Sequence, residues 1–91
     1  MRVRWTPNAV SDLVRIVERI REDNPSAAQR VARAIYTGVA SLRKFPYRGR
    51  IGLVPGTREL VFGPLPYIAV YEVIEDQAQV LRIRHTSQNW P

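Results

Sequence analysis

Two copies of one helix-start signal place most of the first half of the chain in helices. A capping residue is followed directly by proline at Thr6-Pro7 and again at Asn24-Pro25. Thr and Asn side chains accept hydrogen bonds from N–H groups of the first helical turn, where proline is tolerated because its position needs no N–H donor. The pattern predicts one helix that begins near Pro7 and ends at Asn24-Pro25, and a second that stops before Pro46.

Both segments have the apolar spacing of amphipathic helices, with intervals of three and four residues. The predicted core positions are Val10, Leu13, Val14, Val17 and Ile20 in the first helix, and Ala28, Val31, Ala32, Ile35, Val39 and Leu42 in the second. Asp12, Glu18 and Arg19 are predicted to lie on the solvated face of the first helix. The two helices are expected to form an antiparallel hairpin.

Beyond Pro55-Gly56 the pattern becomes that of extended strands. Alternating or apolar runs predict strands at residues 58–62, 67–74 and 79–85, besides a short strand at residues 3–5. Glu75-Asp76-Gln77 is short enough for a hairpin, so the late strands are predicted to form a three-stranded antiparallel meander. Residues 1–91 therefore predict a single α+β domain, with the helical hairpin on one face of a small sheet. The other face is left for solvent or a partner.

No acidic residue occurs between Asn24 and Glu59. The same run contains seven basic residues, which are Arg30, Arg33, Arg43, Lys44, Arg48, Arg50 and Arg58. Since the whole chain has a formal net charge of +6, this run concentrates the positive charge on one surface. Such a surface predicts a polyanionic partner.

The turn at residues 45–50, FPYRGR, combines an aromatic residue with Arg48 and Arg50. This combination is typical of loops that bind nucleic acids. Phe45 is predicted to anchor the turn in the core. Tyr71 in the long strand is also predicted to be a core residue, although tyrosines of this strand could instead stack on bases.

Arg82 and Arg84 alternate with Leu81 and Ile83 in the last strand. If the apolar pair faces the helices, both arginines line the open face of the sheet. They are then candidates for contacting a phosphate or a carboxylate, although two arginines on a solvated strand need no function.

Composition excludes several classes of protein. The chain has no cysteine and one histidine, so neither a disulfide framework nor a cysteine-based zinc site is available. No apolar run approaches the roughly 20 residues of a membrane helix, and the N-terminus does not have the apolar segment of a signal peptide. We expect a cytoplasmic protein without metal or cofactor.

Five segments in order, VRWTPNA, FPYRGR, PGTREL, PYIAVYEV and LRIRHTSQNWP, resemble the toxins of the RelE/ParE superfamily over essentially the whole chain. The resemblance implies the toxin of a bacterial type II toxin-antitoxin module. It implies a hetero-oligomer with a cognate antitoxin, whose acidic segment wraps the toxin. It also implies one of two targets, because ParE-like members poison DNA gyrase whereas RelE-like members cleave messenger RNA on the ribosome.

The residues favour one of these branches. Metal-free RNA cleavage needs a group that activates the 2′-hydroxyl, cations around the phosphate, and a proton donor. Compared with the RelE pattern, Leu60, Ile68 and Gln88 occupy positions where further cations are expected. These departures favour ParE-like poisoning of gyrase, with RelE-like ribonuclease activity as the alternative. For a ribonuclease, the catalytic candidates would be Arg58, Arg84 and His85.

His85 does not discriminate between the branches, and a structural or partner-binding role is favoured for it over a catalytic one. The candidates for binding the target or the antitoxin are Arg48, Arg50, Arg58, Arg82, Arg84 and Trp90. A third interpretation is a nucleic-acid-binding module without toxicity, for which the basic run alone would suffice.

Overall fold

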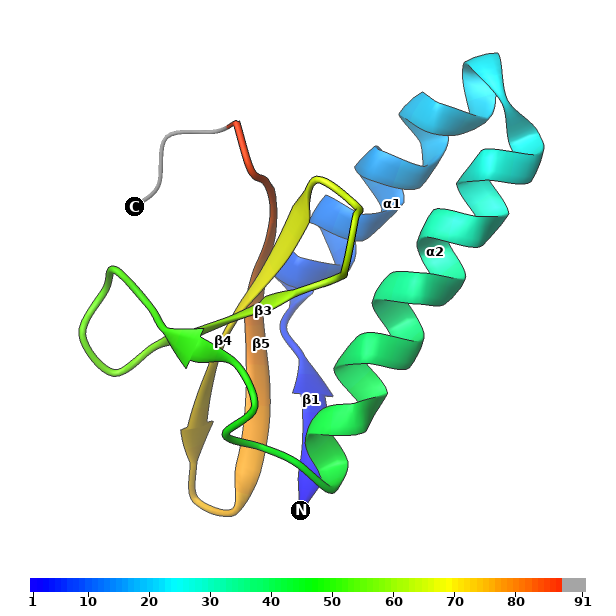
Figure 1. Cartoon of the computed structure of the whole chain (residues 1–91). Coiled ribbons are helices and arrows are strands. Elements are labelled where there is room, and N and C mark those ends of the chain that lie inside the picture. The colour runs from blue at the N-terminus through cyan, green and yellow to red at the C-terminus, as the bar shows by residue number, and fades with distance from the viewer. Residues whose placement is uncertain (88–91) are drawn as a thin grey trace.

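A five-stranded sheet carries both helices on one face (Figure 1). The computed structural model describes residues 1–87, and Gln88 and Trp90 lie outside this range. The α+β class is confirmed. The elements are β1 (Arg2–Trp5), α1 (Pro7–Asp23), α2 (Pro25–Ala40), the 3-10 helix η1 (Ser41–Arg43), β2 (Arg50–Ile51), β3 (Arg58–Val61), β4 (Tyr67–Ile74) and β5 (Gln77–His85).

The two predicted helix starts are confirmed by their caps. Thr6 Oγ1 accepts a hydrogen bond from Ala9 N at 3.2 Å, and Asn24 Oδ1 accepts one from Ala27 N at 3.0 Å. The Thr6 hydroxyl also donates to the carbonyl oxygen of Leu81 at 3.1 Å. The cap of α1 is thereby joined to β5, which fixes where the helix meets the sheet.

The predicted apolar face of α2 is confirmed, but that of α1 is partly wrong. Val10 and Val14 are 46% and 49% exposed, whereas Ala9 and Asp12 are buried. The helix is rotated because the Asp12 carboxylate turns toward β5 and binds there. The side chains of α1 that pack against the core are Ala9, Leu13, Ile16 and Ile20.

The strand order is β1-β5-β4-β3-β2. The antiparallel meander of β3, β4 and β5 is confirmed, while β2 and the parallel pairing of β1 with β5 were not predicted. Parallel neighbours need a long crossover connection, and here α1 and α2 form part of it. A register shift pairs Tyr71 with Val80 but Val70 with Arg82, so Leu81 is the extra residue of a bulge.

The sheet face opposite the helices is not left free. Glu59, Ile68 and Val70 lie on this face by strand alternation, and their exposed fractions are 5%, 7% and 0%. The main core lies on the helix-facing side, where α2 packs on side chains that include Leu60 and Tyr71. Both faces of the central strands are thus covered by the chain itself, in contrast to the prediction.

The β4–β5 turn consists of Glu75 and Asp76, with positive φ angles of 49° and 64°. Asn-Gly suits such a turn better than Glu-Asp, because Asn and Gly adopt positive φ angles at a lower energetic cost. We expect the Glu75→Asn/Asp76→Gly double variant to raise the free energy of unfolding by about 0.5–1 kcal/mol in urea titrations. A decrease would show that the turn makes contacts that these side chains need.

Candidate functional site

Residues 45–50, here called the basic loop, follow η1 and are held by Tyr71. The Tyr71 side chain is fully buried, and its hydroxyl donates to Pro46 O at 2.7 Å and accepts from Gly49 N at 2.9 Å. A Cβ atom at Gly49 would come within 2.7 Å of the Tyr71 ring, so glycine is required there. The prediction of Tyr71 as a core residue is confirmed, whereas Phe45 is 61% exposed and is not the anchor.

Burial raises the pKa of the Tyr71 hydroxyl, and this effect outweighs the opposing effects of the Gly49 N–H, Arg58 and Arg48. The hydroxyl therefore keeps its proton and remains a donor to the loop.

Arg58 supports the basic loop from β3. Its Nη1 donates to Gly49 O at 2.8 Å and to Tyr47 O at 3.2 Å, and its guanidinium lies 5.1 Å from the centroid of the Tyr47 ring. Such a distance allows a cation–π interaction. Arg48 Nη1 donates to Ser41 Oγ at 2.7 Å. Arg58 thus ties the loop to β3, and Arg48 ties it to η1.

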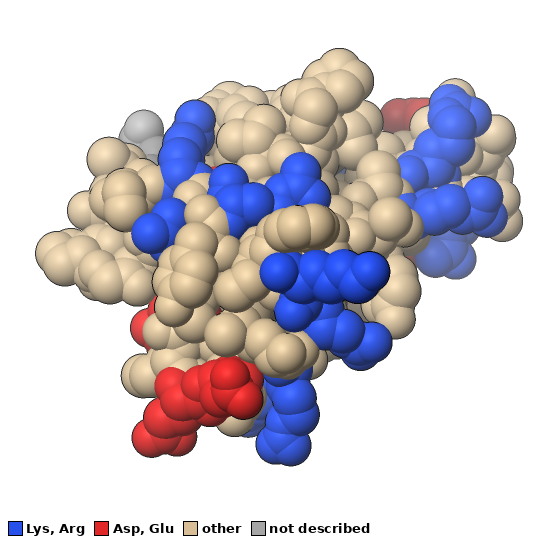
Figure 2. All heavy atoms as spheres, turned by 60° about the horizontal axis from the view of Figure 1, so that its bottom comes forward, with Lys and Arg blue, Asp and Glu red and all other residues tan. Residues whose placement is uncertain are grey.

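The loop and η1 together present a cationic surface with exposed aromatic rings. Phe45 and Tyr47 are 61% and 62% exposed. We call this the basic-aromatic surface, and it consists of Arg43, Lys44, Phe45, Tyr47, Arg48 and Arg58. Figure 2 shows that Lys and Arg side chains gather across the middle of this side of the molecule, while acidic side chains lie mainly at its lower left, with a further acidic patch at the upper right. The surface combines charge for phosphate or carboxylate groups with rings for stacking.

A recess of about 150 Å³ lies on the sheet face opposite the helices. It brings together three of the predicted site residues, Arg50, Arg84 and His85, and Ile68 also lines it. Arg50 is engaged by the buried Glu59 carboxylate, with Nη2–Oε1 and Nε–Oε1 distances of 2.9 and 3.0 Å. The positive charge of Arg50 is therefore balanced within the recess.

Arg58 and Arg84 lie on opposite faces of the sheet. Arg58 pairs in register with Tyr71, whose side chain is on the helix side, while Arg84 pairs with Ile68 on the other side. The structure therefore separates these two catalytic candidates onto different faces of the sheet.

Arg82, also predicted for the open face, is bound by Asp12 of α1. Arg82 Nε and Nη2 lie 2.8 and 2.9 Å from the two Asp12 oxygens, and Ile83 N donates to Oδ2 at 3.0 Å. Asp12 is only 4% exposed. Burial by itself raises the Asp12 pKa, but Arg82, the Ile83 N–H and the charge of Arg84 together lower it below the ordinary value. This carboxylate was predicted to be solvated, because its partners are about 70 positions away in sequence.

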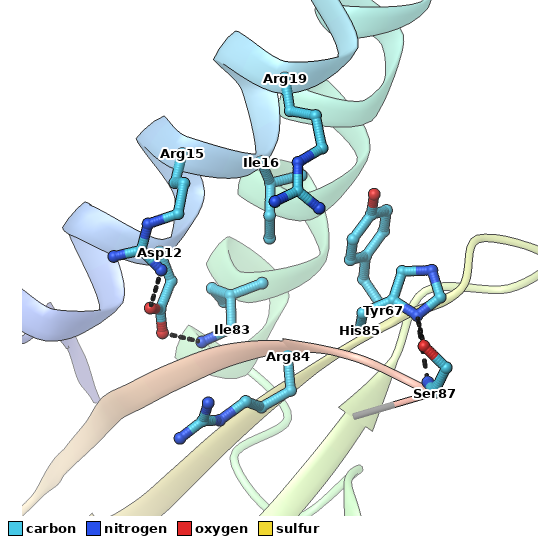
Figure 3. Close-up of a pocket in the computed structure, with 9 residues that line it drawn as sticks. All are labelled: Asp12, Arg15, Ile16, Arg19, Tyr67, Ile83, Arg84, His85 and Ser87. Carbon is cyan, nitrogen blue, oxygen red and sulfur yellow. Dashed lines mark hydrogen bonds and ion pairs between the residues drawn. The ribbon is translucent and has the colours of Figure 1, made fainter. Parts of the chain in front are cut away.

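A second pocket, of about 270 Å³, lies between α1 and the end of β5 (Figure 3). Its cationic lining is Arg15, Arg19 and Arg84, together with His85. Arg15 and Arg19 were not predicted as site residues. Their spacing of four positions along one helix is the signal that could have identified them as neighbours.

His85 is oriented by two neighbours. Its ring packs edge-on against Tyr67, with centroids 5.3 Å apart, and its Nδ1 accepts a hydrogen bond from Ser87 N at 3.1 Å. A backbone N–H can only donate, so Nδ1 carries a lone pair and the proton of the neutral ring is on Nε2.

Among residues 1–87, no three His, Cys, Asp or Glu side chains are grouped as a metal site would require. Neither described helix is long and apolar enough to cross a membrane.

Sequence and structure comparisons identify the class of protein. Residues 3–90 match the family described as "ParE toxin of type II toxin-antitoxin system, parDE". "Putative toxin Y4kP" of Sinorhizobium fredii is 41% identical over 90 residues, which cover 99% of this chain and 93% of that protein. "Toxin RelE2" of Caulobacter vibrioides is 39% identical over 84 residues, which cover 92% of this chain and 93% of that protein.

A solved structure agrees with these relatives. A chain of the "Chromosomal ParDE TA system from P. aeruginosa" superposes with a TM-score of 0.85 at 30% identity, covering 93% of this chain and 95% of its own. The chain belongs to the ParE toxin family of type II toxin-antitoxin systems, within the RelE/ParE superfamily. Because the relatives carry both ParE and RelE names, the names do not decide between the two targets.

Proposed function

We propose that this toxin arrests growth by binding DNA gyrase through the basic-aromatic surface, and that an antitoxin with an acidic segment neutralises it in a hetero-oligomer in the cytoplasm. The observation that carries the proposal is the make-up of the recess containing Arg50, Arg84 and His85, which is poorly equipped to cleave RNA. Such a recess favours action by binding over RNA cleavage.

Cleavage requires a proton acceptor and cations that stabilise the phosphate in the transition state. His85 directs its Nδ1 to the Ser87 N–H, so this nitrogen is engaged within the chain. Arg50 is paired with Glu59. Leu60 and Ile68, at two of the positions where ribonuclease relatives are expected to carry cations, are 3% and 7% exposed. Ile68 and the Arg50–Glu59 pair lower the capacity of the recess for phosphoryl chemistry, and Leu60 lies on the helix-facing side of the sheet.

The basic-aromatic surface has properties that suit binding. Its arginines can contact phosphates, and Tyr47 and Phe45 are exposed for stacking or for apolar contact with a protein. Gyrase bound to DNA offers both kinds of partner. The loop is positioned by buried hydrogen bonds from Tyr71, so little ordering is needed on binding.

The test compares two double variants with the wild type. Tyr47→Ala/Arg48→Gln changes the basic-aromatic surface, and Tyr36→Ala/Arg33→Gln makes the same changes on an exposed part of α2. Purified proteins are added to gyrase with supercoiled plasmid, and separately to ribosomes with a defined messenger RNA. We expect gyrase-dependent DNA breaks from the wild type and the α2 variant, and at least about tenfold fewer from the loop variant.

Two other outcomes would contradict the proposal. Codon-positioned RNA cuts with intact DNA would establish the RelE-like alternative and would make Arg58, Arg84 and His85 the residues to test next. Absence of growth arrest on induction of a stably folded protein would instead support a nucleic-acid-binding module without toxicity.

A further inference from the structure

We propose that the pocket between α1 and the end of β5 is a carboxylate site that takes one Glu or Asp side chain of the antitoxin. The identity of the partner rests on the proposed function, whereas the carboxylate chemistry rests on the pocket alone.

Two guanidinium groups of α1 line the pocket. Arg15 and Arg19 project from the same side of α1, because they are four residues apart, while Arg84 of β5 also lines the pocket but extends its guanidinium to the other side of the strand (Figure 3). Arginine offers a planar fork of donors that fits the two oxygens of a carboxylate. Tyr67 and Ser87 add hydroxyl groups to the lining.

The single carboxylate in the lining, Asp12, is already committed. Arg82 and the Ile83 N–H bind its oxygens at 2.8–3.0 Å, and Arg15 Nη1 forms a longer ion pair with Oδ1 at 3.6 Å. The Arg15 side chain is 64% exposed. The pocket therefore has more positive charge than its own carboxylate balances.

The arginines also repel one another. Burial lowers the pKa of Arg84, and the charges of Arg82 and Arg15 lower it further, against the opposing effect of Asp12. An anion placed among these groups would reduce that repulsion, so the lining is electrostatically suited to a negatively charged guest.

Size and polarity favour a side chain over a nucleic-acid phosphate. About 270 Å³ is smaller than the roughly 300–1,000 Å³ of pockets that enclose drug-sized ligands. Ile16 and Ile83 line the pocket beside the cations. An acidic side chain has methylene groups to place against these isoleucines, whereas a backbone phosphodiester has only polar oxygens at its charged end.

The pocket is separate from the basic-aromatic surface. The pocket lies where β4 begins and β5 ends. The basic-aromatic surface begins at η1, which follows the C-terminal end of α2 and lies beside the N-terminus of the chain (Figure 1). An acidic side chain bound in the pocket would therefore hold the antitoxin without occupying the surface proposed to contact the target.

A titration with a minimal probe tests the site. N-acetyl-glutamate N-methylamide is added to the labelled full chain, and the arginine Nε–H signals are followed by NMR. The neutral glutamine analogue and dimethyl phosphate serve as comparison ligands. Arg19→Ala removes one lining cation, and Arg21→Ala makes the same change at an exposed position of α1 outside this pocket.

We expect the glutamate probe to shift the Arg15 and Arg19 signals in a saturable way. Its affinity should fall about tenfold in Arg19→Ala and stay unchanged in Arg21→Ala. No saturable shift at these two signals, or an equal response to the glutamine analogue, would overturn the proposal. Tighter binding of dimethyl phosphate would also overturn it, in favour of a phosphate site.

Growth assays separate this inference from the proposed function. Arg19→Ala should still arrest growth when expressed alone, but it should need more of the antitoxin from the neighbouring gene for rescue. If the wild type does not arrest growth, the proposed function fails while the titration still decides on the pocket. If the titration is negative, the carboxylate site fails regardless of toxicity.

Discussion

Asp12→Ala is expected to lower the free energy of unfolding at pH 7 by about 3 kcal/mol, because it removes one partner of a buried ion pair. The change would leave the Arg82 guanidinium, of which 29% is exposed, without its carboxylate. It would also leave the buried N–H of Ile83 without the Asp12 acceptor. Urea unfolding of the variant and the wild type measures this difference.

Glu18→Ala is the matched control, since Glu18 is an exposed acidic residue of the same helix. Its effect should stay within about 0.5 kcal/mol. A loss of less than 1 kcal/mol in Asp12→Ala would show that the ion pair contributes little beyond its desolvation cost.

The stabilisation by Asp12 should depend on pH in a defined direction. The folded state lowers the Asp12 pKa from its ordinary value of 3.8, so the unfolded state takes up the proton first on acidification. The stabilisation by Asp12 is therefore complete above the pKa that Asp12 has in the unfolded state. It is lost as the pH falls through the lower pKa that Asp12 has in the folded state. The difference between the wild type and Asp12→Ala should accordingly shrink below about pH 4.

Tyr71→Phe is expected to cost about 2 kcal/mol and to weaken toxicity, although the ring and its packing are kept. Without the hydroxyl, Pro46 O loses a donor and the buried Gly49 N–H loses its acceptor. The basic loop would then be held mainly by Arg58 and Arg48. We expect faster amide hydrogen exchange in residues 46–50 and a reduced activity on the target.

Tyr36→Phe removes the same hydroxyl from a side chain that is 64% exposed on α2, and it should be silent in both measurements. Full toxicity of a Tyr71→Phe protein with increased loop exchange would show that the basic loop need not be ordered for function. That result would argue against the basic-aromatic surface as the part of the toxin that binds the target.

Local signals in the sequence were sufficient for most of the fold. Thr6 and Asn24 start the two helices as predicted, because a cap and the proline that follows it act within one turn. The bounds of β4, Tyr67–Ile74, were also predicted correctly. Alternation placed Tyr71 in the core, since a residue on the helix-facing side of a central strand has little access to water.

The errors concern side chains whose partners are remote in sequence. Asp12 looked like one of several solvated charges of an amphipathic helix, and only its position against β5 makes it a buried anchor. Its burial rotates α1 and exposes Val10 and Val14. Likewise, Phe45 appeared to be the anchor of the loop because it is apolar, but a polar group of Tyr71 performs that role.

Predictions for the site were limited by the same cause. Strand alternation cannot report that a bulge at Leu81 shifts the register, or that Arg82 and Arg50 have carboxylate partners on other elements. Arg15 and Arg19 become neighbours of Arg84 only when α1 is docked. Grouping such residues requires the tertiary structure.

The parallel pairing of β1 with β5 has a consequence for when the toxin becomes competent during its synthesis. The first strand and the cap of α1 find their partners, Gln77 to Leu81, only after residues 77–81 have been translated. Contacts of such long sequence separation form slowly and late. A nascent chain that has not yet released β5 from the ribosome cannot complete its core. The folded toxin therefore forms only after residues 77–85 have left the ribosome.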